Sequence, residues 1–435
     1  MIKITSISKR LCCALVIFSG FSLFAQDNIN EVHVHTPSRP ACVLPPGEFT
    51  GLISVPRAPE TAARMEAGGS PCATFVVSYN GFTPEAQAAF QYAVDIWANS
   101  IESPVPINVN AQFTSLGAGV LGSAGAATFL TITSGAPGSQ PNTFYPAALW
   151  EKLEGEDRSM FGGSNDINAN FSSDTNWYFG TDANPPAGQF DFVSVVLHEL
   201  GHGLGFAGFA NVEDSFPDDI GDIRFNGAAS IYDAFIENGA GDAILSFPDP
   251  SAALAAQLVG NDLYCNGPTA IAQLNQGGTL PRTFAPTSWQ PGSSYSHWNN
   301  STFPNGDVNS LMTSSIGPGQ ANHNPGFITL GFFQDMGWSI CAGALSVEEL
   351  TVENVSISPN PFVDSIDITL KEGNVSDYSV SLIDINGRFV NTVKQDNNNG
   401  TLTLSNLNNL DTALYFVKIT NEITGNSITK KVVKN

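Results

Sequence analysis

Two histidines and a glutamate in the segment VVLHELGHGLGF (residues 195–206) have the residue types and spacing of a metal-dependent hydrolase. His198 and His202 are four residues apart, so on a helix both imidazoles project from one face and can bind the same ion. Glu199 can reach a water molecule beside the metal and accept its proton. The H-E-x-x-H pattern therefore predicts a helix that carries two zinc ligands and a general base.

A catalytic zinc needs three protein ligands and one open position, so a third ligand must come from elsewhere in the chain. The other histidines are His33, His35, His297 and His323. The first two lie in an N-terminal segment that can be a removable propeptide. Each of the last two is followed by a methionine, Met312 or Met336, and the residues alone leave both pairs open.

The elements that must position these residues are indicated by the pattern of apolar side chains. Residues 73–79 and the segment DINANFS (residues 166–172) have the β-branched content or the alternation of strands. Thr83 is the expected N-cap of a helix that begins at Pro84. Residues 327–338 predict a second, short helix.

The histidine motif also resembles that of the metzincin zinc proteases, H-E-x-x-H-x-x-G-x-x-H. Gly205 stands at the glycine position, but Gly208 stands where the third histidine is expected. Leishmanolysin-type metzincins depart in a similar way, because their third histidine lies far downstream, ahead of a Met-turn. The resemblance covers about residues 73–340 and implies an α+β zincin domain with an active-site helix.

Within this resemblance, His297 and Met312 fit better than His323 and Met336. A metzincin domain closes with a helix after the Met-turn, and residues 327–338 provide that helix only if Met312 is the turn. The polar residues around His323 are typical of a turn on the surface. The expected site therefore consists of His198, His202 and His297 as zinc ligands, Glu199 as general base and Met312 beneath the metal.

Two further expectations follow from the same resemblance. In metzincins an edge strand that pairs with extended substrate precedes the active-site helix, and residues 166–172 occupy that place. A cysteine can hold a metzincin latent by binding its zinc; Cys42 is the candidate, although a structural disulfide is the preferred interpretation of this residue. After the first 25 residues the cysteines are Cys42, Cys72, Cys265 and Cys341, and their three possible pairings stay open.

The chain divides into four predicted parts. Residues 1–25 combine basic side chains with a short apolar stretch and predict a secretory signal peptide. Residues 26–72 form an N-terminal segment or propeptide, and residues 73–341 form the protease domain. Residues 347–435 predict a small C-terminal β-sandwich, because short alternating strands are separated by turn residues. No later apolar run is long enough to be a stable membrane span.

The charge of the chain excludes some partners. Residues 27–340 contain 29 acidic and 7 basic side chains, which gives a formal charge of −22. Such a body repels nucleic acid and anionic lipid, so neither is an expected partner. The acidic residues between 213 and 222 are compatible with structural Ca²⁺, although a solvated acidic loop is the preferred interpretation. These residues are Glu213, Asp214, Asp218, Asp219 and Asp222.

The C-terminal part resembles the type A sorting domain of the type IX secretion system of Bacteroidetes-like bacteria. The resemblance rests on SPNPF at residues 358–362, on LIDINGRFV and LYFVKIT, and on the final KKVVKN. It implies that the type IX secretion machinery is a partner and that the chain crosses the outer membrane, to be secreted or held at the cell surface.

The combined prediction is a secreted zinc-dependent endopeptidase that hydrolyses a protein or peptide substrate through a zinc-activated water, with Glu199 as general base. The alternative is a non-catalytic secreted or cell-surface binding protein that retains a zinc site. The intact Glu199 favours the enzyme, because a purely structural zinc needs no base and usually has four protein ligands.

Overall fold

The structure is a computed structural model that describes most of the chain. The described residues are 32–37, 42–117, 119–132, 139–157, 165–214, 218–274, 280–342, 355–370, 378–385, 388–394, 401–421 and 427–435. The predicted signal peptide, residues 1–25, lies outside them. Within this described part, no helix is long and apolar enough to cross a membrane.

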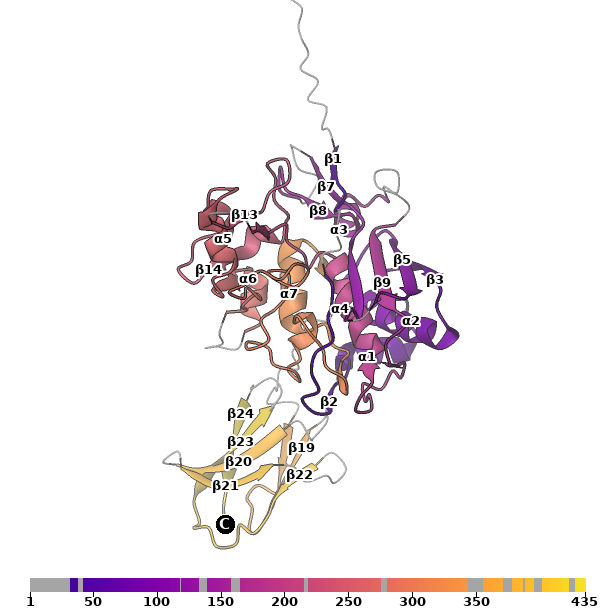
Figure 1. Cartoon of the computed structure of the whole chain (residues 1–435). Helices are drawn as coiled ribbons and strands as arrows, with labels where there is room; N and C mark the ends of the chain where they lie inside the picture. The colour runs from indigo at the N-terminus through magenta and orange to yellow at the C-terminus, as the bar shows by residue number, and fades with distance from the viewer. Residues whose placement is uncertain are drawn as a thin grey trace, which may run out of the picture.

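A four-stranded sheet is the framework of the first half of the chain (Figure 1). Its strands, in spatial order, are β3 (Phe75–Asn80), β5 (Ile107–Thr114), β9 (Ile167–Ser172) and β6 (Gly122–Ala126). The first three are parallel, and β6 is antiparallel to β9. Strand β9 forms where DINANFS predicts a strand, but it lies inside the sheet. The expectation that this segment is the edge strand is therefore wrong, because β6 covers it.

The sequence of β6 explains why this edge strand is hard to recognise. Its five residues, GSAGA, are all small and all buried, so they show neither alternation nor β-branched side chains. Small side chains allow the neighbouring helix to approach closely. A Cβ atom at Gly122 would lie 3.2 Å from side-chain atoms of Glu199, Phe171 and Val195.

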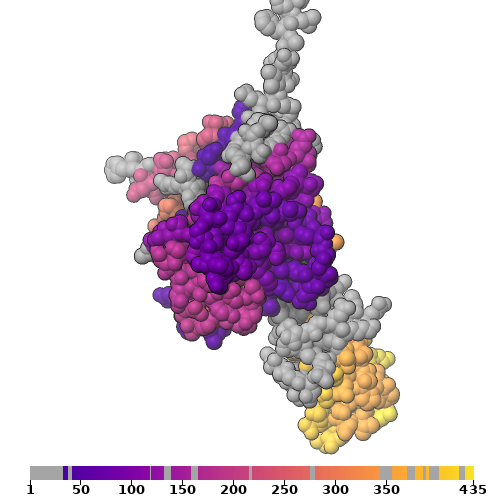
Figure 2. Space-filling model, turned by 90° about the vertical axis from the view of Figure 1, so that its right-hand side faces the viewer, coloured from indigo at the N-terminus to yellow at the C-terminus, as the bar shows by residue number. Residues whose placement is uncertain are grey.

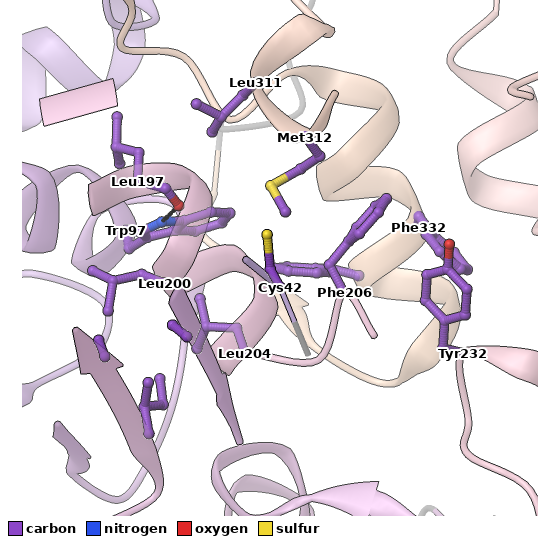
Figure 3. Close-up of a cluster of buried hydrophobic side chains, with 14 of the residues drawn as sticks. Cys42, Trp97, Leu197, Leu200, Leu204, Phe206, Tyr232, Leu311, Met312 and Phe332 are labelled. Atoms are coloured by element: carbon purple, nitrogen blue, oxygen red, sulfur yellow. Dashed lines mark hydrogen bonds between the residues drawn. The ribbon is translucent and has the colours of Figure 1, made fainter. Parts of the chain in front are cut away.

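Two helices pack against each other and against this sheet: α2 (Pro84–Ala98) and α4 (Phe192–Gly203). As predicted, α2 starts at Pro84, and the Thr83 side chain accepts a hydrogen bond of 3.2 Å from the Ala86 amide. The indole N–H of Trp97 donates to the Leu197 carbonyl over 3.0 Å and so fixes α2 to α4 (Figure 3).

Helix α7 (Phe327–Met336) forms where residues 327–338 predict a helix. The remaining helices and strands of the body are short. These short elements are α1 (Pro59–Ala67), β1 (Val32–His35), β2 (Ile53–Val55), β4 (Ile101–Glu102), β7 (Phe129–Ile132), β8 (Tyr145–Pro146), α3 (Ala147–Glu154), β10 (Trp177–Tyr178), β11 (Phe190–Asp191), β12 (Asn211–Glu213), β13 (Ile220–Asp222), β14 (Ile236–Asn238), α5 (Ala252–Leu258), β15 (Leu263–Cys265), α6 (Pro268–Ala272), β16 (Gln320–Asn322) and β17 (Ser339–Ile340). Figure 2 shows how the N-terminal half, in indigo and purple, forms one face of the body.

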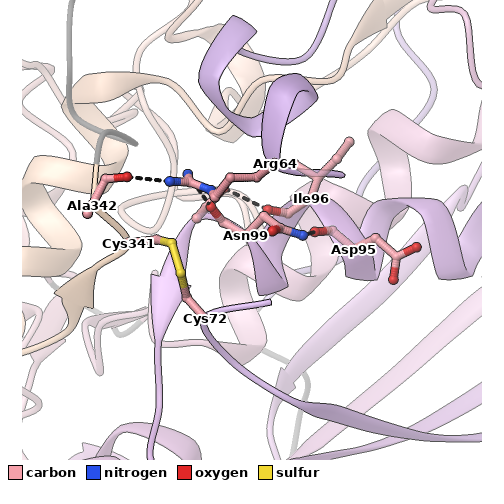
Figure 4. Close-up of a disulfide and its surroundings, with 8 residues drawn as sticks. Arg64, Cys72, Asp95, Ile96, Asn99, Cys341 and Ala342 are labelled. Carbon is pink, nitrogen blue, oxygen red and sulfur yellow. Dashed lines mark hydrogen bonds between the residues drawn. A yellow bond between two sulfur atoms is a disulfide. The ribbon is translucent and has the colours of Figure 1, made fainter. Parts of the chain in front are cut away.

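Much of the N-terminal segment is an integral part of this body. Strand β2 pairs in parallel with β16. Arg64 of α1 donates hydrogen bonds to the carbonyls of Asn99 and Ala342 (Figure 4). A disulfide joins Cys72 to Cys341, near the two ends of the predicted protease domain. Cys265 is free and buried.

The C-terminal strands form two sheets around a core of their own (Figure 1). One sheet contains β18 (Val355–Ser358), β19 (Ile366–Leu370) and β22 (Thr401–Leu404); the other contains β21 (Phe389–Lys394), β20 (Tyr378–Asp384), β23 (Leu414–Asn421) and β24 (Ser427–Val433). Alternate residues of these strands, such as Val380, Leu382, Val417 and Ile419, are buried between the sheets. The described residues thus have the sandwich arrangement that the alternating pattern predicts.

Candidate metal centre

Helix α4 carries the H-E-x-x-H motif, and its N-terminus is fixed by buried polar contacts. The Asp191 carboxylate caps the helix by accepting from the Ser194 amide over 2.7 Å. The same carboxylate oxygen lies 2.8 Å from Nε2 of His323, whose side chain is only 1 % exposed. His323 therefore orients the helix and lies outside the group of possible metal ligands.

The expectation that His323 lies in a surface turn is wrong. Its backbone amide donates to the Val55 carbonyl over 2.8 Å, so the turn is covered by the N-terminal segment. The adjacent Asn322 amide donates to the Ser194 hydroxyl over 2.7 Å. Polar residues that the sequence suggests are exposed to solvent here form hydrogen bonds with other parts of the chain.

Three imidazoles from two distant segments converge at one point. Nε2 of His202 lies 3.0 Å from Nε2 of His198 and 3.2 Å from Nε2 of His297, and the third separation is also 3.2 Å. The Sγ atom of Cys42 lies 3.5 Å from the Nε2 atom of His198 and 3.3 Å from that of His297. The structure therefore brings together the three histidines that the sequence analysis selects, and it adds Cys42.

The other ring nitrogens determine the tautomer of each histidine. Nδ1 of His198 lies 2.7 Å from the Leu311 carbonyl, and Nδ1 of His202 lies 2.7 Å from that of Phe206. Nδ1 of His297 lies 2.6 Å from the Ser293 carbonyl. A carbonyl oxygen only accepts, so each Nδ1 carries the proton and each neutral ring presents an Nε2 lone pair to the centre.

Three lone pairs separated by about 3 Å repel one another unless a cation lies between them. Burial lowers the pKa of His198 to about 4 and, aided by the charge of His198, that of His297 to about 3. Burial also holds the pKa of His202 well below its usual value. All three rings are neutral at physiological pH, which is the form that binds metal, so the group of Cys42 and three histidines can hold a metal ion.

Glu199 lies beside this group, close to the Ala124 amide and the Cys42 thiol. Its side chain is fully buried, and neither carboxylate oxygen makes a hydrogen bond of good geometry to a described residue. Burial raises its pKa well above the usual value for glutamate. A buried carboxylate of this kind needs a proton, a cation or a polar ligand close by.

The turn after α4 explains why residue 208 is not the third ligand. Gly205, at a φ of 121°, reverses the chain and brings the Phe206 carbonyl to His202. A Cβ atom at Gly208 would lie 2.2 Å from the Tyr295 ring and 2.4 Å from the Asp233 carboxylate. The segment that carries His297 fills the space that a histidine at residue 208 would need.

That segment is fixed by a buried cluster, the tyrosine–aspartate cluster of Tyr232, Asp233 and Tyr295. The Tyr295 hydroxyl donates to Asp233 over 2.9 Å, and the Tyr232 hydroxyl donates to the Tyr295 carbonyl over 2.8 Å. Asp233 also accepts from the Phe209 amide. Tyr295 has a φ of 74°, a conformation that a non-glycine residue keeps only where its surroundings impose it. Sequence reasoning finds no signal for this cluster.

Met312 lies against α4 on the side of the motif. It ends the short 3₁₀ helix η3 (Ser310–Met312) and is fully buried (Figure 3). A Cβ atom at Gly201 would lie 2.7 Å from its sulfur, so the glycine before His202 permits this close contact. Met336 lies in α7 within the core.

Cys42 reaches the histidines because the N-terminal segment adds a short extended stretch to the edge of the sheet. The Cys42 amide donates to the Ala124 carbonyl over 3.2 Å, and the Leu44 amide donates to the Gly122 carbonyl over 2.9 Å. The bridge between Leu44 and Gly122 is antiparallel. The preferred expectation of a disulfide at Cys42 is therefore wrong: its thiol is free, buried and directed at the histidines.

Among the described residues, the group at Cys42 is the only one of three or more His, Cys, Asp or Glu side chains arranged to hold a metal. The acidic residues considered for calcium are not gathered in such a group. Asp222, for example, accepts a hydrogen bond of 3.1 Å from the Asn211 side chain. The structure thus adds nothing in favour of a calcium site.

Comparisons with known proteins identify the C-terminal part of the chain. Residues 356–435 match the family described as the secretion system C-terminal sorting domain. Residues 140–220, which include α4, match a family described as SPBPB7E8-like. No curated protein matches the chain significantly.

One solved structure shows a limited similarity. It belongs to PorZ, an essential bacterial surface component of the type-IX secretion system of Porphyromonas gingivalis, and the match has 19 % identity and a TM-score of 0.17. The match covers 23 % of this chain and 14 % of the PorZ chain. A similarity of this size carries no argument about the fold.

The C-terminal sandwich is thus a type IX sorting domain, as its sequence resemblance predicts. Such a domain directs the chain to export, so the protein is secreted or displayed at the cell surface. The type IX secretion machinery is accordingly a partner of this chain.

Proposed function

We propose that this protein is a secreted zinc-dependent endopeptidase in which His198, His202 and His297 bind zinc. The proposal rests mainly on one observation: all three Nδ1 atoms donate to carbonyls, so all three Nε2 lone pairs face one point. Tetrahedral zinc, with bonds to nitrogen of about 2.0–2.1 Å, separates such nitrogens by roughly 3.3 Å. The separations of 3.0–3.2 Å here are close to that value. When bound, zinc is a Lewis acid that polarises a carbonyl and lowers the pKa of water.

Glu199 is the proposed general base. One of its buried carboxylate oxygens takes a proton from the attacking water, and the resulting acid passes that proton to the leaving amine. Burial raises the pKa of Glu199, and a carboxylate with a raised pKa is the stronger base once it is ionised. Its oxygens make no hydrogen bond of good geometry to a described residue, which leaves them available to the reacting molecules.

The substrate in this proposal is an extended polypeptide that pairs with β6. The N-terminal segment already pairs with this edge through the amides of Cys42 and Leu44. Main-chain pairing of this kind provides affinity without strong selection of side chains. While the segment is in place, it covers the edge and puts Cys42 in the fourth ligand position, so this state of the chain is latent.

A second candidate function is favoured by the same cysteine. Cys42 completes a set of one thiolate and three imidazoles, and four protein ligands are typical of a structural zinc. The protein would then be a surface binding protein without turnover. The buried Glu199, whose oxygens make no hydrogen bond of good geometry to a described residue, is our reason for preferring the enzyme, because a structural site gains nothing from such a residue.

The replacement Cys42→Ala separates the two functions. If the protein is the proposed enzyme, the Cys42→Ala variant of the full chain keeps three ligands and zinc. It also hydrolyses casein, and a chelator stops this reaction. The double variant with Glu199→Gln should be inactive. Cys265→Ala is the matched control, since Cys265 is also free and buried but lies outside the ligand group. If Cys42→Ala loses its zinc and stays inactive after zinc is added back, the structural site is the correct description.

A further inference from the structure

An aromatic pocket lies beyond the metal centre, and nothing in the proposed mechanism uses it. Its four rings surround the imidazole of His35 in the N-terminal segment. The centroid distances to His35 are 4.0 Å for Phe225, 5.1 Å for Phe209, 6.0 Å for Phe144 and 6.3 Å for Phe129. We call these four phenylalanines the aromatic pocket.

His35 enters the pocket from strand β1, which precedes Cys42 in the same N-terminal segment. Strand β1 pairs antiparallel with β7, with His35 opposite Phe129. Further along, Leu44 pairs antiparallel with Gly122 of β6. The two described stretches of the segment, at His35 and at Leu44, therefore both lie antiparallel to the chain that leads from Gly122 to Phe129. A polypeptide that follows this path reaches both the pocket and the metal centre.

A hollow of about 570 Å³ adjoins the aromatic pocket and extends to residues next to the metal centre in sequence. At one end it is lined by Gly125 of β6 and by Ser296, the residue before His297. At the other end it is lined by His35, Phe209 and Phe225. The aromatic pocket thus opens into a hollow that ends beside Ser296, the residue before His297.

The chemistry of the pocket selects a planar, uncharged ring. Phenylalanine rings contact His35 in tilted and edge-on arrangements, which favour another ring over a branched aliphatic chain. Burial lowers the pKa of His35, so its imidazole is neutral at physiological pH. Phe225 is 37 % exposed even with His35 in place, so the pocket is open to solvent on one side.

Strand β1 is an occupant that can leave. Within the described residues it pairs only with β7, over four residues, and His33 and Val34 are exposed. Short edge strands of this kind open at low cost in free energy compared with the core. Its departure would expose the aromatic pocket without disturbing the sheet that carries α4.

We propose that the aromatic pocket is a subsite for a ring side chain of a polypeptide bound in the cleft, seven positions before the residue at the metal centre. His35 and Cys42 are that pair of residues in the latent chain. The identification of the polypeptide as a substrate rests on the proposed function, whereas the ring-binding property of the pocket does not.

The first experiment measures ring binding by the full chain. N-acetyl-phenylalanine amide is titrated by NMR against native protein, His35→Ala, His35→Phe and the control His33→Ala, with N-acetyl-leucine amide as the comparison ligand. We expect His35→Ala to bind the phenylalanine amide at least ten-fold more tightly than the native, His35→Phe and His33→Ala proteins. Adding Phe209→Ala to His35→Ala should remove this binding. Equal binding by all variants, or equal binding of the leucine amide, would overturn the proposal.

The second experiment tests the link to bound polypeptide without requiring turnover. A labelled peptide of residues 32–44, with Ser in place of Cys42, is titrated against full-length protein that carries His35→Ala and Glu199→Gln. Peptides with His or Phe at residue 35 should bind at least ten-fold more tightly than the peptide with Ala. Equal affinities would overturn the subsite assignment. An inactive Cys42→Ala protein would instead contradict the proposed peptidase and leave both binding results unaffected.

Discussion

Glu199 illustrates how single residues decide the proposed chemistry. His198, the residue before it, belongs to the group that can hold a metal, and the oxygens of Glu199 are buried without a hydrogen bond of good geometry. In the proposed enzyme, replacing this carboxylate by an amide would remove the general base. A metal site alone would tolerate that change.

We predict that Glu199→Gln keeps bound metal and loses peptidase activity by at least about 100-fold, the usual contribution of general acid–base catalysis. The comparison is best made in the Cys42→Ala background, where the fourth ligand position is open. Metal content and casein hydrolysis should be measured on the same preparation. Full turnover with full metal would exclude Glu199 as the base.

His297 and His323 provide a second test at the residue scale. We expect His297→Ala to lose both zinc and activity, because it removes one of the three imidazoles at the centre. We expect His323→Ala to keep zinc but to lower the free energy of unfolding by about 1–3 kcal/mol, because Asp191 loses a buried partner. Zinc analysis and thermal unfolding of both variants check this. Loss of zinc in His323→Ala alone would reverse the assignment.

At the scale of elements, the metal centre depends on two segments that meet without being neighbours in sequence. Helix α4 supplies two histidines, and the loop that ends at His297 supplies the third, 95 residues after His202. The tyrosine–aspartate cluster joins them, since Asp233 bonds to Phe209 after the helix and to Tyr295 before His297.

We therefore predict that Tyr295→Phe weakens zinc binding by roughly ten-fold, the lower end of the effect of outer-shell contacts on metal affinity. The substitution removes only the hydroxyl that donates to Asp233 and keeps the ring that fills the space beside Gly208. Competition with a chelator measures the affinity. Tyr79→Phe is the control, because the Tyr79 hydroxyl on the edge strand β3 donates an exposed hydrogen bond to the Gln91 side chain of α2. Equal zinc affinities of the two variants would show that the cluster does not position His297.

At the scale of the whole molecule, the body and the sorting domain have separate hydrophobic cores. The disulfide between Cys72 and Cys341 closes the body before the sandwich begins. Export and the proposed chemistry should accordingly be separable.

We predict that deletion of residues 347–435 leaves the protein in the periplasm with its zinc still bound. The reason is that the deleted residues include the sorting domain and no member of the ligand group. Cell fractionation and metal analysis of the truncated protein test the two parts of the prediction. Normal export of the truncated chain would contradict the sorting role.

The sequence by itself determined the local features of this protein. The four-residue spacing on an apolar helix specified His198, Glu199 and His202, and alternating strands at the C-terminus indicated the sandwich that the family comparison identifies as a sorting domain. These features depend on periodicity, which neighbouring residues encode directly. The choice of His297 was predicted from a family resemblance.

Only the tertiary structure decided the contacts between distant segments. For Cys42 the sequence favours a disulfide over the alternative of zinc binding, but pairing with β6 directs its thiol to the histidines. The sequence predicts a surface turn at His323, but strand β2 covers this residue. Strand β6 consists of small residues, so its sequence shows no strand pattern. Burial, hydrogen-bond partners and edge pairing depend on which remote segment packs on a residue. The local pattern of side chains does not specify that segment.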